Sequence, residues 1–396
     1  MTSPSMIEES SGDTVEFGWT AEQERRYREL LEASQQRYHT ADFDGVADHG
    51  GSLRGHWPGL AELGVLGLAV PGRHGGQGHG ALDTARMFEA FGCGWPDTGV
   101  VFAVGAHQFA CAVPLARFGG EALRERWLPG MCSGELIAGN AMTEQEAGSD
   151  VSGLSVTAHR VTGGYLLDGT KSFVSNGPVA DVLVVYATTD PEAGYLGQTA
   201  FLVETTTDGV EAGGAFAKMG LESVPAGTVT FRECFVPDAN VLGHVGGGAA
   251  IFQHSMGWER SCLFAGYLGL LDRIVDDVRA RVTSRKQFGE SLSRFQAVAH
   301  RVADMKLRAE SARLLLYRAC WEIDRNGSAP LDIALSKLAV SESVVASALD
   351  AVRLFGAEGY RVEPGIERVL RDSVPSLLFS GTSEIQKNVI ARELGL

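Results

Sequence analysis

The apolar residues of this 396-residue chain change their spacing twice along the sequence. Up to about residue 138 they recur as they do in helices. Between about 139 and 243, short runs rich in β-branched and aromatic residues alternate with turn residues such as Gly163 and Gly164, which predicts an antiparallel sheet. After about 247 the helical spacing returns. This order predicts an α+β protein with an N-terminal helical domain, a middle β domain and a C-terminal helical bundle.

The same pattern sets the expected boundaries. We place the helical domain at 19–138, the β domain at 139–243 and the C-terminal helices at 244–396, after a disordered lead-in at 1–18. Residues 181–187 are apolar at consecutive positions, which predicts a strand buried on both faces. In 295–323 the apolar residues step by three and four, which predicts one helix of about eight turns.

The composition narrows the class of protein. A hydrophobic content of 44% is that of a globular protein, and a formal net charge of −15 argues against nucleic-acid binding. The polar N-terminus does not resemble a secretory signal, and we expect no membrane segment, because no apolar run approaches about 18 residues. The six scattered cysteines are typical of reduced thiols in a cytoplasmic protein, and no metal-ligand spacing stands out.

Seven unusual strings occur in a fixed order from the start of the β region to the C-terminus. They are AMTEQEAGSD (141–150), GTKSFVSNG (169–177), FVPDANVLG (235–243), RKQFG (285–289), LFGAEGY (354–360), ERVLRD (367–372) and GTSEIQ (381–386). Together, on a helix–sheet–helix background, they make the chain resemble the acyl-CoA dehydrogenases from about residue 20 onward. Each string alone is weak evidence for the family, because a Ser/Thr-rich loop or an apolar Phe has ordinary structural roles.

The resemblance implies an FAD cofactor and assigns one group of residues to its ring. Thr143 is expected to hydrogen-bond the flavin, with backbone help from Met142, and Ser149 to lie on its substrate side. Phe173 and Ser175 take the place of the family's usual Trp-x-Thr/Ser, so Phe173 keeps the stacking but loses an indole donor.

A second group is expected to hold the dinucleotide tail of a flavin that is bound by a neighbouring subunit. Arg285 would reach the pyrophosphate, because a guanidinium suits phosphate oxygens. The assigned residues are Arg285, Gln287, Phe288, Phe295, Gln296, Arg353, Gly356, Thr382 and Glu384, although the family often has glutamine in place of Arg353. The resemblance therefore implies a homo-oligomer, most often a tetramer.

The catalytic base is the point where the chain departs from many members of the family. Ser380 stands where they have a glutamate immediately before the Gly-Thr of the last string, and a serine without a partner base does not abstract an α-proton. Glu259, in SMGWERSCLF, matches the helical position from which isovaleryl- and long-chain-specific members supply their base. Phe252, Leu263 and Gly266 should share its helix face and desolvate it, which would raise its pKa. The alternative is a solvated helix glutamate paired with Arg260 or a lysine.

The implied reaction converts an acyl thioester to the enoyl thioester. Glu259 takes the α-proton and the β-hydride goes to flavin N5, while a backbone N–H near Ser380 and Gly381 stabilises enolate character at the thioester carbonyl. Arg260 orders the pocket. The side chain of Ser380 is expected to transfer no proton.

Several alternatives stay open. The runs WERSCLFAGYLG and FAVGAHQFACAVPLARFG resemble members that act on carrier-protein-bound acyl or aminoacyl groups in secondary metabolism, but free CoA esters are equally compatible. A flavin-dependent monooxygenase of the same superfamily would explain Ser380, although the intact RKQFG and GTSEIQ strings favour tightly held FAD. A non-catalytic thioester-binding protein is the third reading. An electron-transfer flavoprotein is the family's usual electron acceptor.

Overall fold

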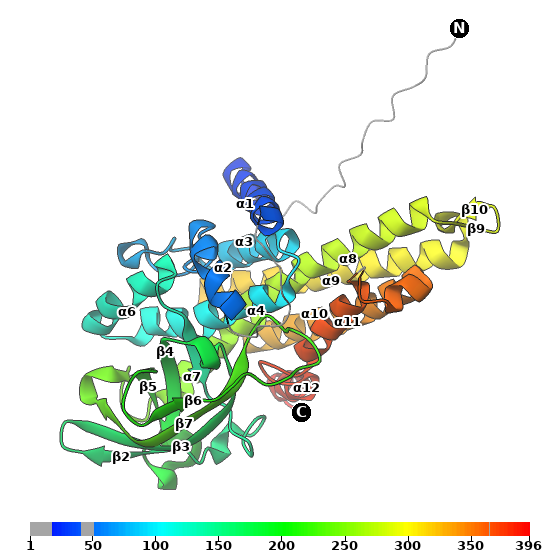
Figure 1. Ribbon diagram of the computed structural model, residues 1–396. Coiled ribbons are helices and arrows are strands. Elements are labelled where there is room, and N and C mark those ends of the chain that lie inside the picture. Colours follow the sequence, from blue (N-terminus) through cyan, green and yellow to red (C-terminus); the bar gives the residue numbers. More distant parts are fainter. Residues whose placement is uncertain (1–17, 41–50, 364) are drawn as a thin grey trace.

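The structure is a computed structural model that describes residues 18–40, 51–363 and 365–396. The predicted lead-in at 1–18 therefore lies outside the described residues, apart from Gly18. The N-terminal and C-terminal helices pack against each other, the β-sheet lies to one side of them, and the C-terminal helices form a long rod that extends away from the sheet (Figure 1).

The N-terminal body is helical, as the periodicity predicts. Within the described residues its helices are α1 (Ala21–Thr40), α2 (Gly51–Glu62), α3 (Ala81–Gly94), α4 (Thr98–His107), α5 (Val113–Phe118) and α6 (Glu121–Ser133). A π-helical turn at Gln108–Ala112 joins α4 to α5. By length and composition Thr98–Phe118 could cross a membrane, a stretch that the search for apolar runs overlooked. Because 94% of its most apolar window is buried inside the protein, it is a core helix here.

The middle body is an eight-stranded sheet in which the strands run in the order β6-β7-β3-β2-β4-β5-β8, with β1 paired to β4. Its strands are β1 (Ala138–Ala141), β2 (Thr157–Val161), β3 (Gly164–Ser175), β4 (Val182–Thr188), β5 (Gln198–Glu204), β6 (Val210–Ala212), β7 (Ala226–Pro237) and β8 (Val241–Leu242). Most of the pairs are antiparallel, as predicted, but the sheet is mixed, because β4 pairs in parallel with both β1 and β2. The doubly buried strand at 181–187 is confirmed as β4, whose first six residues are all buried.

The C-terminal helices also follow the predicted periodicity. They are α7 (Gly248–Trp258), α8 (Phe264–Ser284), α9 (Gln296–Asn326), α10 (Pro330–Phe355), α11 (Ile366–Ser373) and α12 (Ser383–Glu393). The long helix expected at 295–323 is α9, although Phe295 precedes it as its N-cap. The RKQFG string lies just beyond α8, which stops at Ser284, and residues 285–291 form a hairpin of β9 (Lys286–Gln287) and β10 (Glu290–Ser291).

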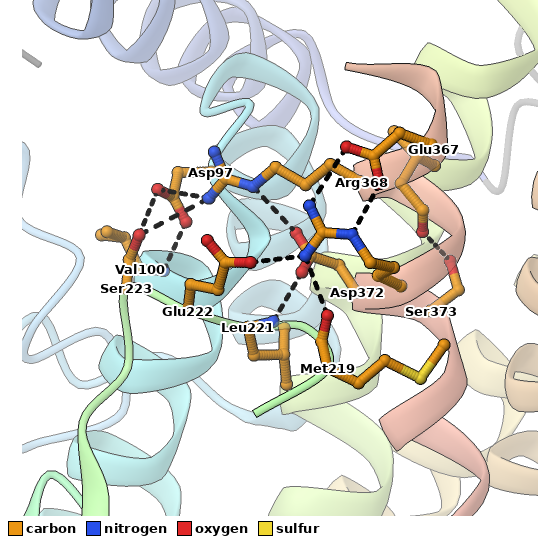
Figure 2. Close-up of polar contacts among 12 residues, drawn as sticks. Asp97, Val100, Met219, Leu221, Glu222, Ser223, Glu367, Arg368, Asp372 and Ser373 are labelled. Atoms are coloured by element: carbon orange, nitrogen blue, oxygen red, sulfur yellow. Dashed lines mark hydrogen bonds and ion pairs between the residues drawn. The ribbon is translucent and has the colours of Figure 1, made fainter. Parts of the chain in front are cut away.

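A polar junction ties the three bodies together (Figure 2). Arg368 on α11 contacts Asp97, the N-cap of α4, with 2.8 Å between Nη2 and Oδ2. Asp97 also accepts a hydrogen bond of 2.5 Å from Ser223 of the loop before β7. In that same loop the N–H of Leu221 donates to Asp372 on α11, at 2.5 Å. Each body therefore supplies a group to one cluster.

Candidate active site

Glu259 lies in a π-helical turn, Glu259–Leu263, that joins α7 to α8. A wide turn adds one residue to a helix and redirects the side chains that follow it, and such turns are frequent at functional sites. The second π-helical turn, Gln108–Ala112, packs against it, with the Phe109 and Trp258 rings stacked 6.4 Å apart. The expected apolar setting is confirmed, because Phe252 and Leu263 are buried and Glu259 itself is only 8% exposed.

The structure brings Ser380 to Glu259 from 121 residues away. The Ser380 hydroxyl donates to Glu259 Oε2 at 2.7 Å. Ser380 has a left-handed backbone, with φ of 53°, and its carbonyl accepts a hydrogen bond of 2.8 Å from Arg260 Nε. The carbonyl of Gly381 accepts a hydrogen bond from Gln386. The loop before α12 is therefore fixed against the turn that carries Glu259.

Burial controls the charge of this carboxyl group. Desolvation raises the pKa of Glu259 to about 7, whereas the hydrogen bond from Ser380 and the charge of Arg260 lower it. A pKa near the working pH is what a general base needs, because the carboxylate is then both present and basic. This setting differs from the alternative reading of Glu259 as a solvated helix residue, which is therefore wrong.

A cavity of about 510 Å³ opens beside the Glu259–Ser380 pair. Its wall includes Arg260 and Gly381, the chain neighbours of Glu259 and Ser380, and also Ser149 from the loop after β1. Three of the four residues expected on the substrate side thus line one space, and the fourth, Ser380, touches the base. The remaining wall comes mainly from α7, the α9–α10 connection and α12.

Phe173 forms a ready platform for a flat ring system. It lies at an irregularity in the pairing of β3 with β7, has a left-handed φ of 53°, and leaves 61% of its side chain exposed. Its ring contacts that of Phe216, with centroids 5.2 Å apart. Such exposure of an aromatic side chain is costly in water and is removed when a planar ligand covers it. The residues present therefore fit the isoalloxazine ring of FAD.

A buried ion pair, which the sequence analysis missed, holds this platform. Lys171 and Glu144 are almost fully buried and lie 2.7 Å apart (Nζ to Oε1), and Lys171 also donates to the carbonyl of Met142. Glu144 accepts further hydrogen bonds from the loop at Ser155. The pair thereby joins the strand of Phe173 to the loop of Thr143. Both residues stand in the family strings, one or two positions from assigned residues, which was the available signal.

The residues expected at the dinucleotide tail lie elsewhere. The hairpin with Arg285, Gln287 and Phe288 sits at the far end of the α8–α9 rod from the sheet (Figure 1). These three residues are exposed, Phe288 by 94%. Gln296, Arg353 and Gly356 are exposed as well, while Phe295 is half-buried against Phe288. The structure does not bring this group to Thr143 and Phe173 within one chain.

Thr382 and Glu384 lie at the start of α12, close to Ser380. The Thr382 hydroxyl caps the helix by accepting from the N–H of Ile385 at 3.3 Å. Hydrogen bonds from backbone N–H and from Thr382 lower the pKa of the exposed Glu384. Both side chains already have local structural partners at this helix start.

Comparison with known families shows which family the chain belongs to. Models for the N-terminal, middle and C-terminal domains of acyl-CoA dehydrogenases match residues 21–135, 139–234 and 246–395. The chain belongs to the acyl-CoA dehydrogenase family. This membership confirms the expected three-body fold, the FAD cofactor and the class of reaction, dehydrogenation of an acyl thioester.

Among its relatives, an L-prolyl-[peptidyl-carrier protein] dehydrogenase of Pseudomonas fluorescens is 50% identical over 86% of this chain and 90% of its own length. The crystal structure of the prolyl acyl carrier protein oxidase AnaB has a TM-score of 0.91 and 38% identity, covering 96% of this chain and all of that one. The FAD complex of PigA has a TM-score of 0.91 and 41% identity, covering 96% of this chain and 99% of the other.

Proposed function

We propose that this acyl-CoA dehydrogenase family member oxidises a prolyl group that is attached as a thioester to a carrier protein. The observation that carries the proposal is the buried Glu259–Ser380 pair beside a cavity, in a chain half identical to a prolyl-carrier-protein dehydrogenase. A prolyl thioester has an α-proton next to the carbonyl and hydrogens on the adjacent ring carbon. It can therefore undergo the α,β-dehydrogenation for which the family is built.

The residues of this chain divide the work as follows. Glu259 removes the α-proton, since burial has raised its pKa to about 7 and it lies next to the cavity wall. Backbone groups around Ser380 and Gly381 orient the thioester carbonyl, and Arg260 holds that backbone in place. Thr143 and Phe173 hold the flavin. When bound, FAD accepts the hydride from the β-carbon.

The charges around the cavity agree with a substrate on a phosphorylated arm. Among the described residues that line it, Arg260 and Arg392 are charged and none is acidic, although the chain as a whole carries a net charge of −15. A phosphopantetheine arm has one phosphate and is common to CoA and to carrier proteins. The charges of the cavity are therefore compatible with a thioester of CoA or of a carrier protein, and the relatives favour the carrier protein.

The proposed assembly is a homotetramer in which each flavin contacts two chains. Its support is the exposed, separate position of Arg285, Gln287 and Phe288. An apolar stripe on α9 adds to it, because Leu307, Leu314 and Trp321, seven residues apart, are 42–66% exposed. Exposed apolar stripes of this kind commonly mark subunit contacts.

For the electron acceptor we propose an electron-transfer flavoprotein. One solved relative, however, carries the name of an oxidase. The enzyme reduced under anaerobic conditions is to be mixed with buffered O₂ and, separately, with an electron-transfer flavoprotein. Slow reoxidation by O₂ and fast reoxidation by the flavoprotein support the proposal, whereas fast reoxidation by O₂ alone contradicts it.

The substrate is tested by anaerobic titration of the FAD-loaded protein. Prolyl-carrier protein, prolyl-CoA and isovaleryl-CoA are each added, and the bleaching of the flavin absorbance is followed. We expect the prolyl-carrier protein to reduce the flavin fastest, with mass spectrometry showing a loss of two hydrogens from the prolyl group. Faster reduction by isovaleryl-CoA would overturn the proposed substrate, and a hydroxylated product formed with a flavin reductase in air would indicate the monooxygenase.

A further inference from the structure

Ser380 occupies a position at which its side chain serves the base rather than replacing it. Within the described part of the chain, it is the one side chain that hydrogen-bonds Glu259, through its hydroxyl and Oε2 at 2.7 Å. A carboxylate accepts such a bond more strongly than a carboxylic acid does, because charge strengthens the hydrogen bond. The bond also fixes one oxygen of a group that otherwise rotates freely about its last side-chain bond.

The backbone of Ser380 is arranged to present that hydroxyl. Its φ of 53° is a left-handed conformation that a non-glycine residue adopts only at a cost. Arg260 Nε holds the Ser380 carbonyl at 2.8 Å, and Gln386 Nε2 holds the next carbonyl at 3.0 Å. Side chains from the Glu259 turn and from α12 thus fix the Ser380–Gly381 loop on both sides.

The other titratable groups around Glu259 do not supply this contact. Cys111 on the facing π-helical turn and Tyr186 on β4 both have pKa values raised by burial, so they stay neutral near pH 7. Arg260 lowers the pKa of Glu259 through its charge, while its Nε is engaged by the Ser380 carbonyl. Ser380 is therefore the neighbour that both touches the carboxylate and favours its ionised form.

We propose that Ser380 is a positioning residue for the base: its hydroxyl holds Glu259 ionised and in one orientation for α-proton removal. This inference rests on the proposed role of Glu259. It gives the Ser380 side chain a function in the reaction without assigning it a proton transfer.

The test is the pH dependence of flavin reduction in the FAD-loaded enzyme, followed anaerobically with a saturating prolyl-carrier protein. Ser380→Ala and Ser380→Gly both remove the hydroxyl, but only glycine relieves the left-handed backbone. We expect the midpoint of the rate–pH curve to move up by about one unit in both variants, which lowers the rate at pH 6.5 about eightfold and leaves it close to wild type at pH 9. Ser380→Thr, which restores a hydroxyl, should return the midpoint toward the wild-type value.

Ser383→Ala is the matched control. Ser383 is a buried serine three residues further on, and its hydroxyl donates to a different glutamate, Glu342, at 2.9 Å. Its removal should leave the midpoint unchanged. A midpoint unchanged in Ser380→Ala and Ser380→Gly, or moved only in Ala, overturns the positioning role.

A double mutant separates this inference from the proposed function. In the double mutant Glu259→Gln with Ser380→Ala, the flavin should be reduced at the same rate as in Glu259→Gln alone, because neither protein has a base for the serine to hold. If Glu259→Gln by itself keeps the wild-type rate, the base is wrongly assigned. If it loses the rate while the Ser380 variants keep the wild-type midpoint, only the positioning role fails.

Discussion

Glu259 shows how one residue's surroundings set its chemistry. This carboxyl group is only 8% exposed, and burial raises its pKa to about 7, although Ser380 and Arg260 lower it. The same burial makes its charge unfavourable to the fold, because a desolvated carboxylate is less stable than one in water. The burial that makes Glu259 a stronger base therefore also lowers the stability of the folded protein when this carboxyl group is ionised.

This opposition predicts a pH-dependent gain in stability for Glu259→Gln. The pKa of Glu259 rises from 4.5 to about 7 on folding, so its contribution to stability is full below pH 4.5 and is lost as pH rises toward 7. The amide cannot ionise. We therefore expect Glu259→Gln to gain up to about 3 kcal/mol relative to wild type between pH 5 and pH 8.5. Equilibrium denaturation of the FAD-loaded proteins at the two pH values measures it, and a gain independent of pH would contradict the raised pKa.

The sequence predicted the residues that share a local segment better than those that meet across the fold. The apolar setting of Glu259 could be foreseen, because Phe252 stands seven positions before it and Leu263 four positions after it. Its bond with Ser380 spans 121 residues, and the Lys171–Glu144 pair spans 27. The residues next to a charged or hydroxyl side chain in the sequence do not reveal such distant partners. From the sequence alone, a side chain of this kind within a polar string is therefore expected to face solvent.

At the scale of elements, periodicity identified the strands and long helices but not how they pair. β4 was recognisable as a doubly buried strand, yet its parallel pairing with β1 joins residues 44 positions apart, Ala138 and Val182. The two π-helical turns were also missed, because one extra residue blurs a helical stripe without abolishing it. Both features depend on long-range packing.

The junction at α11 gives a prediction at this scale. Arg368→Ala removes the guanidinium from two buried carboxylates, Asp97 and Asp372, and leaves them with uncompensated charge. We expect a loss of about 3 kcal/mol in the free energy of unfolding. Arg361→Ala, whose pair with Glu363 is exposed, should change it by less than about 1 kcal/mol. Denaturant titration of both variants measures the free energy of unfolding. Equal losses of this free energy would show that the junction contributes no more than a surface ion pair.

At the scale of the whole molecule, the residues assigned to FAD fall into two groups. Thr143 and Phe173 lie at the sheet, whereas Arg285 and Phe288 lie at the tip of the helical rod (Figure 1). A single chain, as described, does not unite them. The resemblance to the family assigned both groups of residues to FAD. It could not show that they lie far apart in one chain, because their separation depends on the length and direction of the C-terminal helices.

This separation predicts that flavin binding depends on assembly. Arg285→Ala should lower the FAD content per chain, because it removes a phosphate partner from a neighbour's site, while the oligomer keeps its size. The control is Arg279→Ala, which removes an exposed arginine from the last turns of α8, just before the hairpin, and should leave both quantities unchanged. Absorbance at the flavin band and light scattering after gel filtration measure the two quantities. Full FAD retention by a monomeric protein would contradict the two-chain site.

The central claim is that Glu259 removes the α-proton. Glu259→Gln keeps the size and hydrogen-bonding capacity of the side chain but removes its basicity. The most direct measurement is the rate at which a saturating prolyl-carrier protein bleaches the flavin in stopped-flow mixing without oxygen, at equal FAD content. The account predicts a rate two to four orders of magnitude lower, roughly 3–5 kcal/mol of barrier, with little change in thioester affinity. Reduction at close to the wild-type rate would show that Glu259 is a structural residue and that another group is the base.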